Sequence, residues 1–82
     1  MSNKQYVIFI GTGTTMGVAV GAPAAVKMLE ERTEGAKFDL GSRDRVRSFL
    51  EEEEKVFADR NNFSVYSHDG KRFLGSIYQV QE

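Results

Sequence analysis

A glycine- and threonine-rich segment, residues 11–17, contains the first residue types along the chain that could bind a ligand. It reads Gly-Thr-Gly-Thr-Thr-Met-Gly and follows an apolar segment, residues 5–10. Turns of this composition can direct backbone N–H groups and threonine hydroxyls towards a phosphate. The residues that would form such a ligand or phosphate loop are Gly11, Thr12, Gly13, Thr14 and Thr15.

The spacing within this segment departs from two common phosphate-binding motifs. A dinucleotide-binding fingerprint needs glycine where Met16 stands, and a phosphate-loop NTPase needs a Gly-Lys-Thr or Gly-Lys-Ser sequence that is missing here. A phosphate loop also needs a helix directly behind it, which Gly17 and Gly21 disfavour. We therefore expect a hairpin turn, and small-ligand or nucleotide binding by residues 11–17 is the alternative function.

Charged side chains are concentrated in residues 43–54, where three arginines precede four consecutive glutamates. Consecutive helical residues point about 100° apart, so the glutamates cannot converge as a catalytic pair. Glu53 falls on the apolar side of the pattern, where it could be a buried acid, an anchor for an arginine of a partner, or a residue at the rim of the core with its carboxylate in water. Four residues at spacings of i, i+4, i+8 and i+11 share another face: Arg43, Arg47, Glu51 and Glu54. We expect this face to be exposed and to bind a partner protein, and a solvated surface without a binding role is the alternative.

Other reactive groups are few. The chain contains no cysteine and one histidine, His68, which excludes a cysteine nucleophile and a cysteine-based or two-histidine metal site within one chain. His68 and Asp69 stand where we expect a hairpin tip, and a lone histidine there is typically a turn residue. We therefore expect a protein without enzymatic activity, cofactor or metal.

Basic residues suggest a nucleic-acid accessory protein as a further alternative. They are Arg43, Arg45, Arg47, Lys71 and Arg72, and aromatic residues of the last hairpin could add a surface on which bases stack. The net charge is −1, and the glutamates lie within two helical turns of the arginines. Both observations argue against nucleic acid as the partner.

Two hairpins are expected, one at each end of the chain. Residues 5–10 form a continuous apolar run, and residues 15–20 alternate apolar side chains with others, as strands do. Residues 63–67 and 72–80 resemble these two segments. Asp69-Gly70 predicts a two-residue type I′ turn in the second hairpin. Gly17 and Gly75, each inside the second strand of its hairpin, predict β-bulges.

Two helices are expected between the hairpins. The first covers residues 24–32, with Pro23 in its first turn and Gly35 as its C-cap. The second begins after Ser42 as N-cap and ends near residues 60–62. The order ββ-α-α-ββ predicts an α+β fold in which a four-stranded antiparallel sheet carries both helices on one face.

Apolar residues at helical spacing predict the core. The first helix would contribute Ala22, Ala25, Val26 and Leu29, the connector Phe38 and Leu40, and the second helix Val46, Phe49, Leu50, Val56 and Phe57. Two short helices cover one face of such a sheet. The other face would expose some of Tyr6, Val7, Phe9, Tyr66 and Tyr78, and an exposed apolar patch of this kind predicts a homodimer.

The 82 residues predict one domain, residues 1–82. The apolar segment near the N-terminus is too short for a membrane helix or a signal peptide, so we expect a cytoplasmic protein and no membrane partner. A chain this small leaves little room for a catalytic pocket, whereas its mixed charges suit selective contacts. We expect a non-enzymatic module that docks on a larger protein as an inhibitor or modulator, as many small proteins of phages and mobile elements do.

Overall fold

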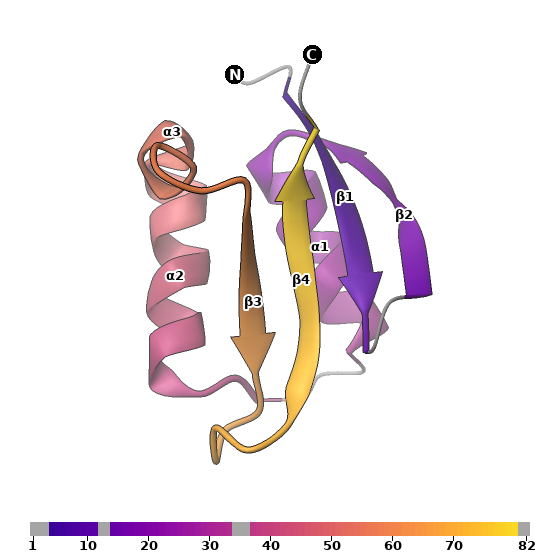
Figure 1. Ribbon diagram of the computed structural model, residues 1–82, viewed down its shortest axis with the longest axis vertical. Coiled ribbons are helices and arrows are strands. Elements are labelled where there is room, and N and C mark those ends of the chain that lie inside the picture. Colours follow the sequence, from indigo (N-terminus) through magenta and orange to yellow (C-terminus); the bar gives the residue numbers. More distant parts are fainter. Residues whose placement is uncertain (1–3, 12–13, 34–36, 81–82) are drawn as a thin grey trace.

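A four-stranded antiparallel sheet with two longer helices on one face forms the fold, as predicted (Figure 1). The computed structural model describes residues 4–11, 14–33 and 37–80, with Thr14 and Thr15 described in the backbone only. The elements are β1 Gln5–Ile10, β2 Thr14–Val20, α1 Ala22–Arg32, α2 Leu40–Glu51, α3 Glu53–Val56, β3 Asn62–Tyr66 and β4 Phe73–Gln79. The strands lie in the order β2-β1-β4-β3, so the first and last strands are the inner pair.

β1 is apolar on both of its faces because it is an inner strand. Tyr6 and Ile8 are fully buried beneath the helices, whereas Val7 and Phe9 lie on the open face and are half-buried. Tyr6 was one of five residues of which we expected the open face to expose some, and it lies on the opposite face. Its ring belongs to the core.

α1 packs against β1 and β2 through a narrow stripe of small and branched side chains. The predicted stripe is buried, namely Ala22, Ala25, Val26 and Leu29. Pro23 stands in the first turn, where its missing N–H costs no helical hydrogen bond. Gly35, the predicted C-cap, lies outside the described residues.

α2 begins earlier than predicted because Asp39, and not Ser42, is its N-cap. The Asp39 carboxylate accepts a hydrogen bond from the Ser42 backbone N–H at 2.8 Å. Hydrogen bonds from Ser42 hold the pKa of Asp39 below its usual range. The Ser42 side chain is buried, and its hydroxyl accepts a hydrogen bond from the Tyr66 N–H at 2.9 Å. It therefore ties the helix to the edge of β3.

The predicted second helix is divided in two. α2 ends at Glu51, Glu52 leaves the helical conformation with φ −138°, and the short α3 follows. The break turns the chain so that Val56 and Phe57 still reach the core, as predicted.

Two leucines predicted for the core are exposed. Leu40 is 67% exposed and Leu50 46% exposed. α2 buries only the stripe Ser42, Val46 and Phe49, and Leu50 points about 100° away from Phe49 around the helix. Phe38, the other connector residue, is buried as predicted.

Both predicted bulges are present. The register with β1 shifts between Gly17 and Thr15, and the register with β3 shifts between Gly75 and Phe73. Gly75 is required by close approach, because a Cβ there would lie 2.6 Å from the Phe9 carbonyl oxygen.

The last hairpin is closed by a longer loop than the predicted two-residue turn. The Ser67 N–H donates to the Arg72 carbonyl at 2.8 Å, and the Gly70 N–H donates back to the Ser67 carbonyl at 2.7 Å. Asp69 therefore stands inside a four-residue turn that Gly70 completes with φ 72°. The Asp69 carboxylate accepts from the Ser67 hydroxyl at 2.5 Å and the Lys71 N–H at 3.0 Å, which lowers its pKa.

Four aromatic rings form the centre of the core. Tyr6, Phe49, Phe57 and Phe63 lie with their contacting ring centroids 4.9 to 5.8 Å apart, mostly in edge-to-face or tilted arrangements. They come from β1, α2, the end of α3 and β3, so the cluster joins the helical layer to the sheet.

Replacing Phe49 with Ala should lower the free energy of unfolding by roughly 3–5 kcal/mol, because it opens a cavity inside this cluster. Leu50→Ala is the matched control: its side chain is adjacent in sequence but exposed, so its loss should cost far less. Urea denaturation of both variants measures the difference. Equal losses of unfolding free energy would show that Leu50 contributes to the core as much as Phe49 does.

Candidate functional site

In its described part, the segment after β1 lacks the helix that a phosphate loop needs. Thr14 begins β2, and β2 pairs with β1 from Gln5↔Val20 to Ile10↔Thr14, so a strand follows the loop where a phosphate loop needs a helix. The Gly11 N–H donates to the Leu74 carbonyl at 3.0 Å and is engaged within the fold. Thr12 and Gly13 lie outside the described residues, as do the side chains of Thr14 and Thr15. The described part of the segment forms the expected hairpin.

The predicted charged face is only partly continuous. Arg43, Arg47 and Glu51 are exposed along α2, as expected. Glu54 is also exposed but belongs to α3, beyond the break at Glu52, so the four residues do not share one helix face. The prediction failed there because helical spacing holds only while the helix continues.

The surface of α2 carries leucines as well as charges. Leu40 lies in the first turn and Leu50 in the last, and both are exposed. Arg47 pairs with Asp44 at 3.7 Å, and both side chains are more than half exposed, so this ion pair adds little stability. The arginines of α2 thus remain close to apolar groups at the surface.

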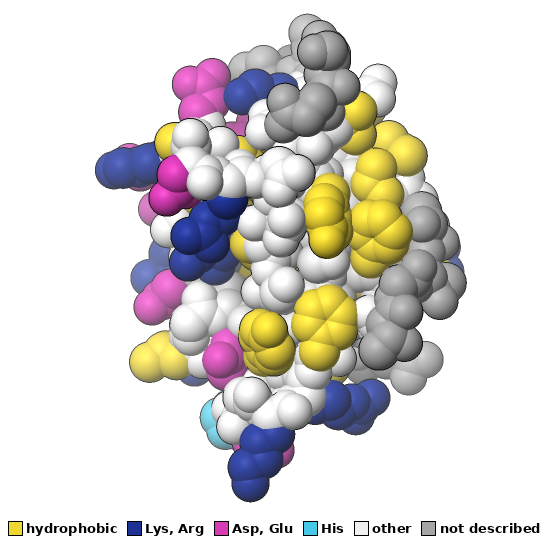
Figure 2. Space-filling view, in the orientation of Figure 1, with side chains coloured by type: hydrophobic (Ala, Val, Ile, Leu, Met, Phe, Trp, Pro, Cys, Tyr) yellow, Lys and Arg dark blue, Asp and Glu magenta, His cyan; other side chains and the backbone are white. Residues whose placement is uncertain are grey.

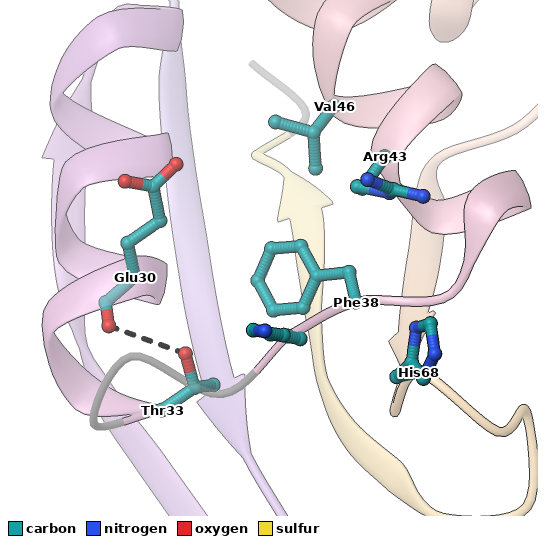
Figure 3. A pocket seen from close by; sticks show the side chains of 7 residues that line it. Glu30, Thr33, Phe38, Arg43, Val46 and His68 are labelled. Atoms are coloured by element: carbon teal, nitrogen blue, oxygen red, sulfur yellow. Dashed lines mark hydrogen bonds between the residues drawn. The ribbon is translucent and has the colours of Figure 1, made fainter.

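A cavity of about 600 Å³ opens between the end of α1 and the start of α2 (Figure 3). It is lined by Glu30, Thr33, Lys37, Phe38, Arg43, Val46 and His68. Phe38 and Val46 are buried and form its apolar floor, whereas Lys37, Arg43 and His68 are exposed at its rim.

The cavity has an uneven charge distribution. Arg43 and His68 lie on one side of Phe38, and across from them lie Glu30 on α1 and Thr33, the C-cap of α1 (Figure 3). Lys37 adds a second cation from the connector. Two cations and a histidine ring face one carboxylate, so the cavity can hold an anionic group next to an apolar one.

The connector before α2 brings the parts of this cavity together. Phe38 forms an isolated bridge with Ser67, and the Asp39 N–H donates to the Tyr66 carbonyl at 3.0 Å. These contacts dock the last hairpin beside the start of α2, which places His68 close to Arg43 (Figure 3).

Sequence reasoning singled out Arg43, His68 and Phe38 separately and did not connect them. It gave Lys37 no role. The pairing of the connector with β3 joins segments about 30 residues apart, and no local spacing encodes such a contact.

The open face of the sheet is the second apolar surface. Hydrophobic side chains gather on it in two groups (Figure 2). Cross-strand pairing places Val18, Val7 and Tyr78 in one row, and the Phe9 ring lies 5.0 Å from the Tyr78 ring. Tyr66 and Phe73 form the other group, with ring centroids 5.8 Å apart. Tyr66 is 41% exposed and Tyr78 38%, as expected for a sheet covered on one side.

Beneath the helices, Tyr6 and Glu53 form a polar contact within the aromatic cluster. The Tyr6 hydroxyl donates a hydrogen bond to the Glu53 carboxylate, which is half-buried. Burial raises the pKa of Tyr6 most, and the hydrogen bond and charge of Glu53 and the charge of Glu54 raise it further. Glu53 was expected to be a buried acid, an anchor for an arginine of a partner, or a rim residue. Its burial is intermediate between that of a buried acid and that of a rim residue, and its carboxylate accepts a hydrogen bond from a core tyrosine.

Among the described residues, no group of three or more His, Asp or Glu side chains is arranged to hold a metal ion. Within that same part of the chain, no helix has both the length and the apolar character needed to cross a membrane.

Tyr6→Phe should lower stability at neutral pH by about 1 kcal/mol, since it removes one hydrogen bond. It should also change the alkaline profile. A raised pKa in the folded state stabilises the fold below the ordinary tyrosine pKa of about 10, and this stabilisation is lost as the pH rises above it. Melting temperatures between neutral pH and about pH 11 should therefore fall more steeply for the wild type than for Tyr6→Phe. If the melting temperatures of the wild type and of Tyr6→Phe fell equally with pH, the pKa of Tyr6 would not be raised in the folded state.

In comparisons with known proteins, no family model, curated protein or solved structure matches this chain. Any function proposed for it must come from its own surface geometry.

Proposed function

We propose that this chain is a small protein-binding module that docks on a larger protein and inhibits or modulates it. The cavity between α1 and α2 carries this proposal. It combines a buried apolar floor with basic side chains from the connector, α2 and the last hairpin.

The cavity defines the chemistry of the partner. Phe38 and Val46 would take an apolar side chain, and Arg43, Lys37 and His68 would take an adjacent carboxylate. A volume of about 600 Å³ lies within the usual range of binding pockets and can accept a few side chains of a docking segment. The expected partner therefore presents an acidic residue beside an apolar one.

The exposed surface of α2 would extend this contact. Arg47 and Glu51 continue along the helix from Arg43, and the exposed Leu40 lies about one turn before Arg43. Arginine beside buried apolar contacts is a common source of binding energy in interfaces. The order of the charges could set the orientation of the partner, because it runs from positive to negative along the helix.

This order of charges is not explained by helix stability. Cations near the start of a helix and anions near its end oppose the helix dipole, at a cost of about 0.3–1 kcal/mol for each charge. α2 has no acidic side chain in its first turn and no basic one in its last turn. A role in binding would account for an arrangement that folding does not favour.

The same cavity supports a second candidate function, the binding of a small anionic molecule with an apolar part. Its size and its single apolar floor with convergent polar groups also suit a small ligand. This function would use the cavity in place of residues 11–17.

Arg43→Glu should test the proposal when its partner capture is compared with that of Arg45→Glu. Arg45 is the matched control, since it lies on the same helix and lines a different hollow beside β3. After affinity capture from the source cell, binding of the captured protein should weaken about tenfold or more for Arg43→Glu, which is about 1.4 kcal/mol, mainly through a slower on-rate. Arg45→Glu should bind as the wild type does.

Two outcomes would contradict protein docking at this site. Equal binding by Arg43→Glu, Phe38→Ser and the wild type would exclude the cavity. A wild type that captures no protein, but melts at a higher temperature with small carboxylates or phosphates in a manner dependent on Arg43, would favour the small-ligand function.

A further inference from the structure

The outer edge of β2 presents backbone groups that point away from the sheet. The Lys4 carbonyl accepts from the Gly21 N–H and the Gln5 carbonyl accepts from the Val80 N–H, both at 2.9 Å. Backbone groups alternate sides along a strand, so Tyr6 and Ile8 bond towards β2. Their partners are Ala19 and Gly17, which leaves the N–H and C=O groups of Val18 and Val20 directed outwards.

Within the described part of the chain, nothing pairs with this edge. β2 is the terminal strand of the sheet, and no hydrogen bond to the backbone of Val18 or Val20 is formed from outside β1. Both side chains are more than half exposed, at 57% and 56%. No charged side chain occurs in residues 5–26, so neither β2 nor the strand beside it carries the charges that usually protect an edge.

The opposite edge of the sheet is protected. Both outward backbone groups of Tyr66 in β3 are bonded: its N–H donates to the Ser42 hydroxyl at 2.9 Å, and its carbonyl accepts from the Asp39 N–H at 3.0 Å. Arg45 and Arg60 line the hollow beside the rest of β3. Among the described residues, the β3 edge is thus covered at Tyr66 and lined by arginines, whereas the β2 edge at Val18 and Val20 is apolar and has no backbone partner.

We infer that β2 pairs with β2 of a second copy of this chain, in antiparallel orientation, to form an eight-stranded sheet. A second copy fits because antiparallel pairing about a twofold axis sets the outward N–H and C=O groups of one β2 opposite those of the other, and β2 carries no charge that would repel its copy. The twofold axis is then perpendicular to the sheet, so the helices of both copies lie on one side and the open faces join on the other. The Val18, Val7 and Tyr78 row becomes continuous between the copies.

This dimer is independent of the proposed function, because the cavity between α1 and α2 takes no part in it. Pairing of one strand buries little area, so we expect dissociation at low protein concentration. The dimer would present two cavities on the same side of the sheet, which would strengthen binding to a partner with two sites.

Val18→Pro tests the pairing. Its missing N–H points away from β1, so the ladder within one chain is kept and only the contact between copies is lost. Sedimentation analysis of the wild type, from micromolar to millimolar concentration, should show the mass rising from 9.2 kDa to twice that value. Val18→Pro should stay at 9.2 kDa throughout, with the circular dichroism spectrum of the wild type. The open-face variant Tyr78→Ser should dimerise as the wild type does.

A charge-swap pair covers the case in which Val18→Pro fails to fold. Val18→Lys and Val18→Glu should each be monomeric, and their mixture should form a heterodimer, because like charges oppose pairing and unlike charges restore it. A wild type of 9.2 kDa at every concentration would overturn the inference. So would a dimer that Tyr78→Ser abolishes and Val18→Pro retains, because the two open faces would then form the contact.

Discussion

The pairing of β1 with β4 holds the two hairpins in one sheet, and the other elements take their positions from it. The two strands lie at opposite ends of the chain, so the contact closes a loop of nearly the whole sequence at an entropic cost that the core must offset. Gly75 lets β4 approach the Phe9 carbonyl closely, and a side chain there would separate the strands. Once the pair forms, β2 and β3 can only be edges.

The inner pair also explains how the helical layer is attached. Tyr6 stands on β1 beneath the helices, and its ring contacts Phe49 and Phe57 while its hydroxyl contacts Glu53. Beyond the break at Glu52, Val56 and Phe57 are buried in the core, whereas Glu54 is exposed.

The two long sides of the molecule differ as a consequence. On one side, the connector and the start of α2 cover the β3 edge, and the same contacts shape the cavity with its basic rim. On the other side, α1 packs against β2 (Figure 1), and among the described residues no hydrogen-bond partner faces the outward backbone groups of Val18 and Val20. The cavity proposed to bind a partner protein and the β2 edge proposed to bind a second copy therefore do not overlap.

The order of the elements was readable from the sequence, because it depends on local patterns. Alternation in β1 and β2, Pro23 at the start of α1 and the glycines at the bulges act over a few residues, and each was interpreted correctly. Part of the core was readable for the same reason: the α1 stripe and Phe49 follow helical spacing.

Tertiary structure decided the rest. Asp39 became the N-cap and Ser42 the tether to Tyr66 because β3 lies beside them, and Leu40 and Leu50 stayed outside because α2 presents a narrow stripe to the sheet. The cavity of Lys37, Phe38, Arg43 and His68 depends on a contact between the connector and the last hairpin, and the free edge depends on which strands became the inner pair. Contacts between distant segments leave no periodic trace in a sequence, so they emerge only when the chain is folded.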